Sequence, residues 1–378
     1  MNSKIFDCAI AGGGLAGLTL AIQLSEAGHS VILFEKEVYP FHKVCGEYIS
    51  MESYDFLERI GMPLSAMNLP MIKEVKISSP DGSALTRKLD LGGFGISRYT
   101  LDSALAGIAR KRGVILLHGT KVNDIIFQDD LFFIKTDQQT YRAKIAYGAY
   151  GKRSALDKKL NRNPVKPVSG RQKNYVAVKY HVKLPFPDNM IELHNFKDGY
   201  CGISKVDGDS VCMCYLTNSK NLKGNNNDIK LMEQNELMKN PFLKKYFADA
   251  VVLYDQPLTI SQITFSKKST IENHVLMLGD SAGSIAPLCG NGMSMAMRAS
   301  FSAFGLTDKY LKGEMTRDEL EISYNREWNS LFSNRIKIGR YMQHLFGKTS
   351  LTNIVVKILR KIPFIADKLI SSTHGNKF

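Results

Sequence analysis

Three glycines near the start of the chain have the spacing Gly12-x-Gly14-x-x-Gly17, directly after the apolar run 5–11. The first glycine allows a tight turn, the second lets a diphosphate approach the backbone, and the third lets a helix pack closely on a strand. Glu35 ends the next apolar run, where a carboxylate can accept hydrogen bonds from ribose hydroxyls. The pattern predicts dinucleotide binding by Gly12, Gly14, Leu15, Ala16, Gly17, Glu35 and Lys36.

A second segment, around residue 280, favours FAD over NAD as that dinucleotide. Residues 275–299 read VLMLGDSAGSIAPLCGNGMSMAMRA, which is typical of a strand, a loop and the start of a helix. Asp280 is placed to bind ribityl hydroxyls, and the helix start would face the flavin ring, where the helix dipole favours the negative charge of the reduced form. The predicted FAD contacts here are Asp280, Pro287, Gly290, Asn291, Gly292 and Met293.

The elements that must position these residues form a βαβ unit. Runs 5–11 and 30–34 have the pattern of strands, and 15–26 between them has helical spacing, so the two strands must be parallel. The sequence therefore predicts an α/β fold with a Rossmann-like FAD-binding domain. A helix over 99–112, a strand over 114–118 and a hairpin over 124–136 are expected to follow.

Residues 174–216 predict a second sheet. Turn signals of Asp, Gly and Pro separate the expected strands 175–182, 190–195, 200–204 and 210–216. A helix is expected over 229–239, and the chain is mainly helical from Ser294. We predict a discontinuous FAD-binding domain (1–70, 95–164 and 262–330), a β-rich substrate domain (71–94 and 165–261) and C-terminal helices (331–378).

The chain resembles the flavoproteins of the p-hydroxybenzoate hydroxylase fold, which include aromatic monooxygenases, flavin-dependent halogenases and geranylgeranyl reductases. The matching segments are GGGLAG at 12–17, PFHKVCGE at 40–47, SRYTLD at 97–102 and GDSAG at 279–283, and KVCGE is most similar to the reductases. The resemblance implies a GR2-type, three-layer ββα domain with an inserted sheet. It also implies that Lys43 and Cys45 lie beside the flavin ring, that Arg98 contacts the FAD phosphates, and that the backbone of Val122 contacts the adenine.

Three departures from that family limit what the resemblance implies. Tyr150 stands where the hydroxylases have an aspartate tied to NADPH binding, so direct reduction by NADPH is in question. The single tryptophan, Trp328, cannot form the paired-tryptophan motif of the halogenases. The reductases have a Tyr/Trp-rich segment over the substrate, whereas this chain has GYCGIS at 199–204.

Two reactions on a hydrophobic organic substrate therefore stay open. One is hydroxylation by an FAD-dependent monooxygenase that uses NAD(P)H and O2, and the other is a geranylgeranyl-reductase-like reduction of isoprenoid C=C bonds. A non-catalytic alternative is a relative of the GDP dissociation inhibitors, which share the dinucleotide fold without flavin, but the intact GDSAG segment argues against it.

The catalytic residues are not identified by the sequence, and two candidates lie in the segment 40–47. Cys45 would be a redox-active or proton-donating thiol, with a small packed side chain under the ring as the alternative. His42 would be a proton relay, with a solvated loop histidine as the alternative. No metal site is indicated, because the six cysteines lack CxxC spacing and a suitably placed histidine.

The formal charge of +14 is concentrated in two segments. Residues 151–183 have ten basic residues and one acidic residue, and residues 331–378 have nine and one. Neither contains a nucleic-acid-binding motif, so no nucleic-acid partner is expected. The first segment would attract NADPH phosphates or form a solvated face. Residues 351–370 have the pattern of a basic amphipathic helix, which would rest on an anionic membrane or cap the fold, bent at Pro363.

The length of 378 residues predicts two or three domains with a substantial core. No run approaches the roughly 18 uninterrupted apolar residues that span a bilayer, and residues 1–7 lack a basic signal-peptide start. Scattered cysteines are typical of free thiols in a reducing compartment. We therefore expect a cytoplasmic protein with peripheral membrane contact as an option.

Overall fold

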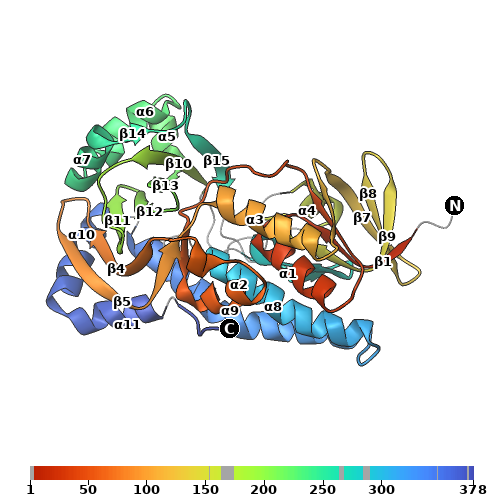
Figure 1. Cartoon of the computed structure of the whole chain (residues 1–378). Helices are drawn as coiled ribbons and strands as arrows, with labels where there is room; N and C mark the ends of the chain where they lie inside the picture. Colours follow the sequence, from red (N-terminus) through yellow and green to blue (C-terminus); the bar gives the residue numbers. More distant parts are fainter. Residues whose placement is uncertain are drawn as a thin grey trace.

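A computed structural model describes residues 4–152, 154–162, 174–263, 268–283, 290–346, 348–372 and 374–378. Two sheets lie toward opposite ends of an elongated molecule, and the long helix α9 (Arg317–Phe346) runs along one side (Figure 1). Pro287 and the basic stretch 163–173 lie outside the described residues. None of the described helices is both long enough and apolar enough to cross a membrane.

The first sheet contains the predicted βαβ unit. Its strands follow the order β16-β17-β9-β1-β2-β6, and the pairs β17–β9, β9–β1, β1–β2 and β2–β6 are parallel. A hairpin of β7 and β8 extends from β9. The bounds are β1 (Ile5–Ala11), β2 (Val31–Glu35), β6 (Ile115–His118), β7 (Val122–Gln128), β8 (Leu131–Thr136), β9 (Thr140–Gly148), β16 (Ile271–Glu272) and β17 (Val275–Met277).

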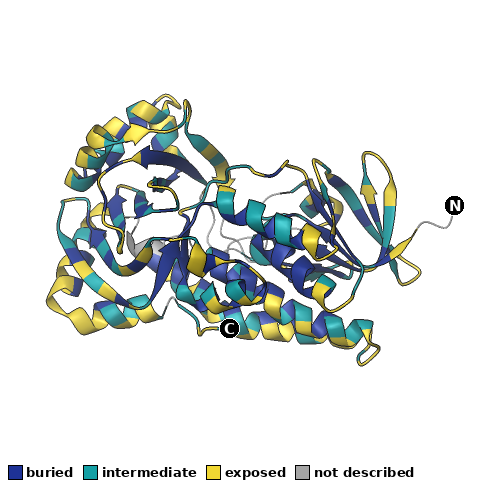
Figure 2. Cartoon of the chain, viewed as in Figure 1, coloured by how far each residue is buried: buried dark blue, intermediate teal, exposed yellow. Residues whose placement is uncertain are grey.

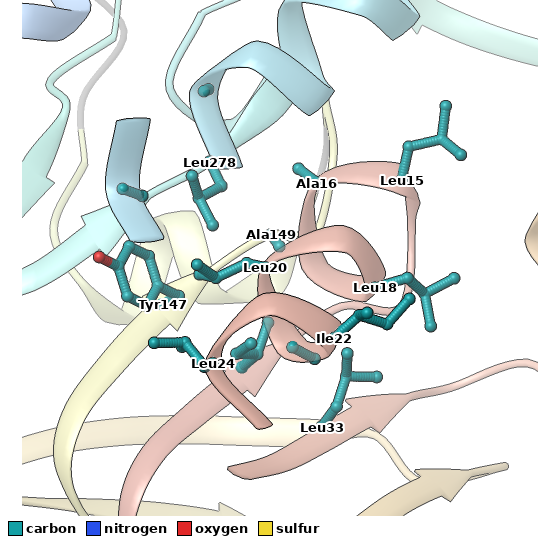
Figure 3. Close-up of a cluster of buried hydrophobic side chains, with 14 of the residues drawn as sticks. Leu15, Ala16, Leu18, Leu20, Ile22, Leu24, Leu33, Tyr147, Ala149 and Leu278 are labelled. Carbon is teal, nitrogen blue, oxygen red and sulfur yellow. The ribbon is translucent and has the colours of Figure 1, made fainter. Parts of the chain in front are cut away.

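Helix α1 (Leu15–Glu26) packs into the core rather than across its surface. Every residue from Leu15 to Leu24 is buried, because the helix is apolar on nearly all sides and lies between the sheet, α3 (Arg98–Lys111) and α8 (Gly292–Leu311). Figure 3 shows its leucines packed with Leu33 of β2 and Tyr147 of β9. This packing fixes the N-terminus of α1 at the end of the parallel strands.

The second sheet is mainly antiparallel. Its order is β14-β10-β13-β12-β11-β4-β5-β3, and β15 also pairs with β10. The β11–β4 pair is parallel and joins two segments that lie far apart in the sequence. The bounds are β3 (Tyr48–Ser50), β4 (Met71–Ser78), β5 (Ala84–Gly95), β10 (Tyr175–Lys183), β11 (Met190–Phe196), β12 (Gly199–Lys205), β13 (Val211–Asn218), β14 (Val251–Val252) and β15 (Leu258–Ile263).

The remaining helices cover the sheets and give two predicted helices their exact form. The predicted helix 229–239 is a short α6 (Ile229–Met232) continued by a π-turn, η3 (Glu233–Leu237). The predicted helix 351–370 is two helices, α10 (Thr349–Lys361) and α11 (Pro363–Ser371), because proline starts a new helix more readily than it continues one. The others are α2 (Tyr54–Arg59), α4 (Ala155–Lys159), α5 (Ser219–Gly224), α7 (Pro241–Asp249) and the short turns η1 (Met51–Ser53), η2 (Leu64–Ala66) and η4 (Gly279–Ser281).

The α/β class and the added β-sheet are confirmed, while the domain boundaries stay a prediction. All strands of the first sheet fall within 1–70, 95–164 and 262–330. The strand β3 falls within 1–70 but pairs with β5 in the second sheet. The segment just before β3 therefore passes from one sheet to the other, which places its side chains between them.

Candidate active site

A cavity of about 1590 Å³ lies between the two sheets. Its walls are the ends of the parallel strands, the segment 41–48 and one face of the second sheet. Pockets for one drug-sized ligand usually measure about 300 to 1,000 Å³, so this cavity has room for two ligands side by side. One end is polar and charged, and we call it the cofactor end; the other, against the second sheet, is the apolar end.

The glycine turn at the cofactor end has the geometry that the sequence predicts. Gly12 has a φ of +120°, and a Cβ there would lie 2.3 Å from the carbonyl oxygen of Ala149. Gly17 does not line the cavity; a Cβ there would lie 2.1 Å from the carbonyl oxygen of Gly12, so its role is close packing of helix on strand. Glycine is required at both positions because a Cβ would clash with a backbone carbonyl oxygen.

Gly14 differs, because it faces the cavity. A Cβ there would meet nothing nearer than the Arg98 and Lys43 side-chain nitrogens, each 3.9 Å away. Gly14 is the N-cap of α1 and no side chain caps it, so the helix's first backbone N–H groups are left for a ligand. Gly14, Leu15 and Ala16 line the cavity here, and this arrangement suits a diphosphate.

The acidic residue that ends β2 is held in place by hydrogen bonds from nearby backbone N–H groups. Glu35 is buried, and its two carboxylate oxygens accept hydrogen bonds at 3.0 Å from the backbone N–H groups of Gly13 and Glu37. Each oxygen has a second lone pair for a ribose hydroxyl. Lys36 and Val122 also line this part of the cavity, as a nucleoside site would require.

Two cations flank the N-terminus of α1. The Arg98 guanidinium donates two hydrogen bonds of 2.7 Å to the Asp102 carboxylate, and the Lys43 ammonium lies 2.9 Å from it. Burial alone would raise the pKa of Asp102, but the charges of Arg98 and Lys43 hold it below its ordinary value. The ionised Asp102 therefore positions both cations beside Gly14, where they can balance a diphosphate.

The second predicted segment reaches the same cavity from the other side. Asp280, Gly290, Gly292 and Met293 line it, whereas Asn291 is buried at the start of α8 and is absent from the described lining. Asp280 is partly exposed, with Lys152 Nζ 3.8 Å away. The structure thus brings the α1 turn and the α8 turn to one cavity.

The segment 41–48 lies along the same cavity. Cys45 Sγ lies 3.6 Å from Met293 Sδ, so the predicted thiol sits against the start of α8. His42 and Lys43 line the cavity as well. The imidazole of His42 stacks on the Tyr99 ring with centroids 4.5 Å apart, which holds it at the cavity wall instead of leaving it as a solvated loop side chain.

A buried charged network follows directly after Cys45. Glu47 is fully buried with a φ of +56°, and its carboxylate accepts hydrogen bonds from Lys179 Nζ and, at 2.8 Å, from the backbone N–H of Arg98. The other carboxylate oxygen lies 2.5 Å from His181 Nε2. Burial alone would raise the pKa of Glu47, but the bond from His181 and the charge of Lys179 lower it. The carboxylate is therefore ionised at neutral pH.

This network continues to His42. Tyr254 Oη lies 2.5 Å from His181 Nδ1 and 3.3 Å from His42 Nδ1. Burial and the charge of Lys179 lower the pKa of His42, so its imidazole is neutral at pH 7. A continuous chain of hydrogen bonds therefore joins the buried Glu47 to a neutral histidine on the cavity wall.

Glu47, His181 and Cys212 also offer ligand atoms within 4.8 Å of one another, which is close enough for a metal ion. However, the Lys179 ammonium already neutralises the carboxylate. Burial also raises the pKa of the Cys212 thiol well above its ordinary value, so the thiolate ligand is disfavoured. The cluster is better explained as a hydrogen-bond network.

Tyr150, the departure from the hydroxylase pattern, lines the cavity beside a second ionic group. Its hydroxyl donates to Asp157 Oδ1 at 3.1 Å and accepts from Arg162 Nη1 at 3.0 Å. Lys268 Nζ lies 2.8 Å from the other oxygen of Asp157. Tyr150 therefore has a structural role among these charges, with Lys152 and Lys158 nearby on the cavity wall.

Mostly aliphatic side chains from several strands form the apolar end. They come from β4, β5, β10, β11, β13 and β15, with additions from α9 and α11. The second sheet presents a largely apolar face because inward side chains alternate along each strand, and Tyr200 and Thr259 also line it. These lining residues are Val75, Ile77, Leu89, Ala177, Ile191, Leu193, Leu216, Leu258, Ile260, Ile263, Met342 and Ile370.

Sequence reasoning missed the partners of Glu47. Lys179 and His181 are two residues apart in β10, which is otherwise apolar or aromatic up to Lys183 at its end, and both point to the same face. A buried lysine and histidine on one face of a strand indicate a paired acid, which was the available signal. Tyr254 comes from a loop after β14, and nothing in its local sequence indicates its place.

The comparisons with known proteins agree with this geometry. The family model described as "FAD binding domain" matches residues 6–330, and the chain belongs to that family. It is a flavin-dependent oxidoreductase, and its cavity has the glycine turns, the buried acid and the phosphate-side cations that FAD requires.

A curated relative and two solved structures are similar over nearly the whole chain. "Digeranylgeranylglycerophospholipid reductase 1" of Methanosphaera stadtmanae is 24% identical, covering 88% of this chain and 82% of its own. A "geranylgeranyl bacteriochlorophyll reductase-like" protein of Thermoplasma acidophilum superposes with a TM-score of 0.78 at 18% identity, covering 99% and 97%. The "flavin-dependent brominase Bmp2" gives 0.79 at 17%, covering 98% and 94%. The structural likenesses show the shared fold.

Proposed function

We propose that this protein is an FAD-dependent reductase that saturates C=C bonds of a long, isoprenoid-like substrate. The observation that carries the proposal is the apolar end of the cavity, which is lined by aliphatic side chains and continues from the cofactor end. An elongated hydrocarbon gains about 25 cal/mol for each Å² buried there. The name of the Methanosphaera relative and the KVCGE segment beside Met293 support the same reading.

FAD would be held by the residues already described at the cofactor end. Gly14 and the first N–H groups of α1 would contact the diphosphate with Arg98 and Lys43, and Glu35 the ribose. Asp280 and the start of α8 would hold the flavin half. When bound and reduced, FAD would supply two electrons and one hydrogen to the double bond.

The chain itself must supply the second hydrogen as a proton. Cys45 and His42 are two proton-bearing groups on the cavity wall, and Cys45 lies against the start of α8. His42 would take a proton from solvent and pass it to the substrate carbon, and the hydrogen bonds through Tyr254 and His181 to the ionised Glu47 would favour its protonated form. The apolar end would exclude water and orient the double bond.

We propose NAD(P)H as the electron donor. Lys152 and Lys158 line the cavity near Asp280 and would attract the donor's phosphates. Tyr150 lacks the charge of the hydroxylase aspartate, but Asp157 supplies a carboxylate to the same group of side chains. Reduction by NADPH tests this part separately from the reductase reaction.

The monooxygenase alternative differs in its acceptor and in its need for oxygen. It requires a site for an electron-rich, usually aromatic, substrate, and the aliphatic lining of the apolar end favours a hydrocarbon chain instead. Both reactions use the same cofactor end. The experiment must therefore compare substrates and oxygen directly.

The test uses the FAD-loaded protein without oxygen. One sample is reduced with NADPH and another with dithionite, and the loss of visible flavin absorbance is followed. A geranylgeranyl lipid is then added, and we expect reoxidation of the flavin with a mass gain of two hydrogens per double bond. Reoxidation only by O2, with one oxygen transferred to a phenol, would contradict the reductase proposal and support the monooxygenase.

A further inference from the structure

The outer face of the two C-terminal helices is apolar and exposed. Five large side chains of α10, α11 and their junction are between 45% and 73% exposed: Ile354, Ile358, Ile362, Phe364 and Ile365. Single exposed apolar residues are common, but a group of this kind on one face marks an interaction surface. Figure 2 shows much of the outward side of α10 and α11 as exposed.

Positive charges lie on the exposed surface of the same two helices. Arg360, Lys361 and Lys368 are exposed, and within the described part of the chain none has a carboxylate within ion-pair distance. The one acidic residue of these helices, Asp367, is held by Arg87 through hydrogen bonds of 2.8 and 2.6 Å. The face therefore combines bulky apolar side chains with unpaired cations.

The inner side of the same helices is part of the core. Val356, Leu359 and Ala366 are buried, and α10 and α11 both pack on β5. Ile370 of α11 reaches the apolar end of the cavity. The helices thus separate the cavity from the exposed face, so they do cap the fold, and their outer side is still available for a partner.

We propose that this outer face, defined as Ile354, Ile358, residues 360–365 and Lys368, docks on an anionic phospholipid bilayer. Apolar side chains would enter the boundary of headgroups and acyl chains while the cations contact anionic headgroups. A symmetric contact with a second copy would place these cations against one another, which disfavours a dimer through this face. The bilayer satisfies both components of the surface.

This inference extends the proposed function, because a membrane would bring a lipid substrate to the wall of the apolar end. Membrane binding is nevertheless measured without the reductase reaction. A failure of the reductase assay would leave the binding result standing, and a failure of binding would leave the reductase assay standing.

The experiment is flotation of the FAD-loaded full chain with vesicles. One set is phosphatidylcholine alone, and the other contains equal amounts of phosphatidylcholine and phosphatidylglycerol. We expect binding to the second set, weakened by salt. The paired variants Arg360→Glu with Lys361→Glu, and Phe364→Ser with Ile365→Ser, should each weaken binding at least about tenfold.

Matched controls change exposed residues elsewhere. Lys244→Glu with Lys245→Glu alters two exposed lysines of α7, and Ile322→Ser alters an exposed isoleucine of α9. These should bind as the unchanged protein does, and FAD content confirms that each variant is folded. Equal binding by all variants, or no flotation with either vesicle, would overturn the proposal. So would a protein that is a dimer in solution and becomes a monomer in the variant Phe364→Ser with Ile365→Ser.

Discussion

The two ends of the cavity are built in opposite ways. At the cofactor end, binding of a diphosphate depends on a few positions, such as the unobstructed Gly14 and the paired Arg98 and Asp102. The apolar end is a broad face of aliphatic side chains from many strands. A phosphate needs fixed donors and charges, whereas a hydrocarbon needs only volume and the absence of polar groups. Substitutions should therefore have severe effects at the first end and graded effects at the second.

The largest effect is expected from Gly14→Val. The new side chain has space in the protein itself, since nothing lies within 3.9 Å of its Cβ, but it would occupy the position of the diphosphate. FAD affinity should fall by about two orders of magnitude or more, with the fold retained. Fluorescence titration of FAD and far-UV circular dichroism measure the two properties. Gly107→Val in α3, also unobstructed, is the control, and similar FAD loss in both variants would refute the comparison.

Glu47→Gln should be the most destabilising change at the boundary between the two ends. It leaves the Lys179 ammonium buried without its counter-charge, and breaking such a pair costs about 3 to 5 kcal/mol. Urea unfolding measures the loss. Adding Lys179→Met should restore most of the stability, because removing both partners avoids an unpaired buried charge. If the double variant is no more stable than Glu47→Gln alone, the broken pair of Glu47 and Lys179 is not the cause of the lost stability.

Acid should destabilise the protein in part through Glu47 and Asp102. The folded pKa values of Glu47 and Asp102 lie below their ordinary values of 4.5 and 3.8. Their stabilisation is therefore present above those values and is lost as the pH falls through the lower folded values. Stability against urea should decrease below about pH 4.5. The Glu47→Gln, Lys179→Met variant should show a shallower decrease, and an unchanged slope would contradict the assignment.

The smallest effect on stability is expected from Gly202→Leu at the apolar end. A Cβ there makes ordinary contacts, 3.6 Å from Leu193, and the longer side chain would project into the cavity. Stability should change by less than about 1 kcal/mol and FAD content should not change. Turnover of a long-chain substrate should fall about tenfold, with a smaller loss for a short one. Loss of FAD from this variant would show that the two ends are not separable.

Much of the cofactor end could be predicted because its signals are local. The turn at Gly12, the helix start at Gly14 and the acid at Glu35 follow one another in a single βαβ unit, whose strands are forced to be parallel. Gly17 and Asn291 show the limit of this reasoning. Both lie in the predicted motifs, yet the structure places neither among the described lining of the cavity. A motif identifies the turn but does not decide which of its side chains face the ligand.

The apolar end and the Glu47 network could not be predicted in the same way. Glu47, Lys179 and Tyr254 are far apart in the sequence and meet only because β10 lies beside the segment 41–48. The parallel β11–β4 pair likewise joins distant segments. Local periodicity gives the faces of a strand but not its neighbours.

The sequence by itself determined the dinucleotide turn, the α/β class and the charge and amphipathic pattern of the C-terminal helices. These depend on backbone sterics and on periodicity within a single element. Only the tertiary structure decided that Cys45 meets Met293, that Glu47 is paired in the interior, and that α10 and α11 have one side in the core and one side exposed. Such properties arise from packing between elements, and desolvation and pairing act on groups only after distant segments have been brought together.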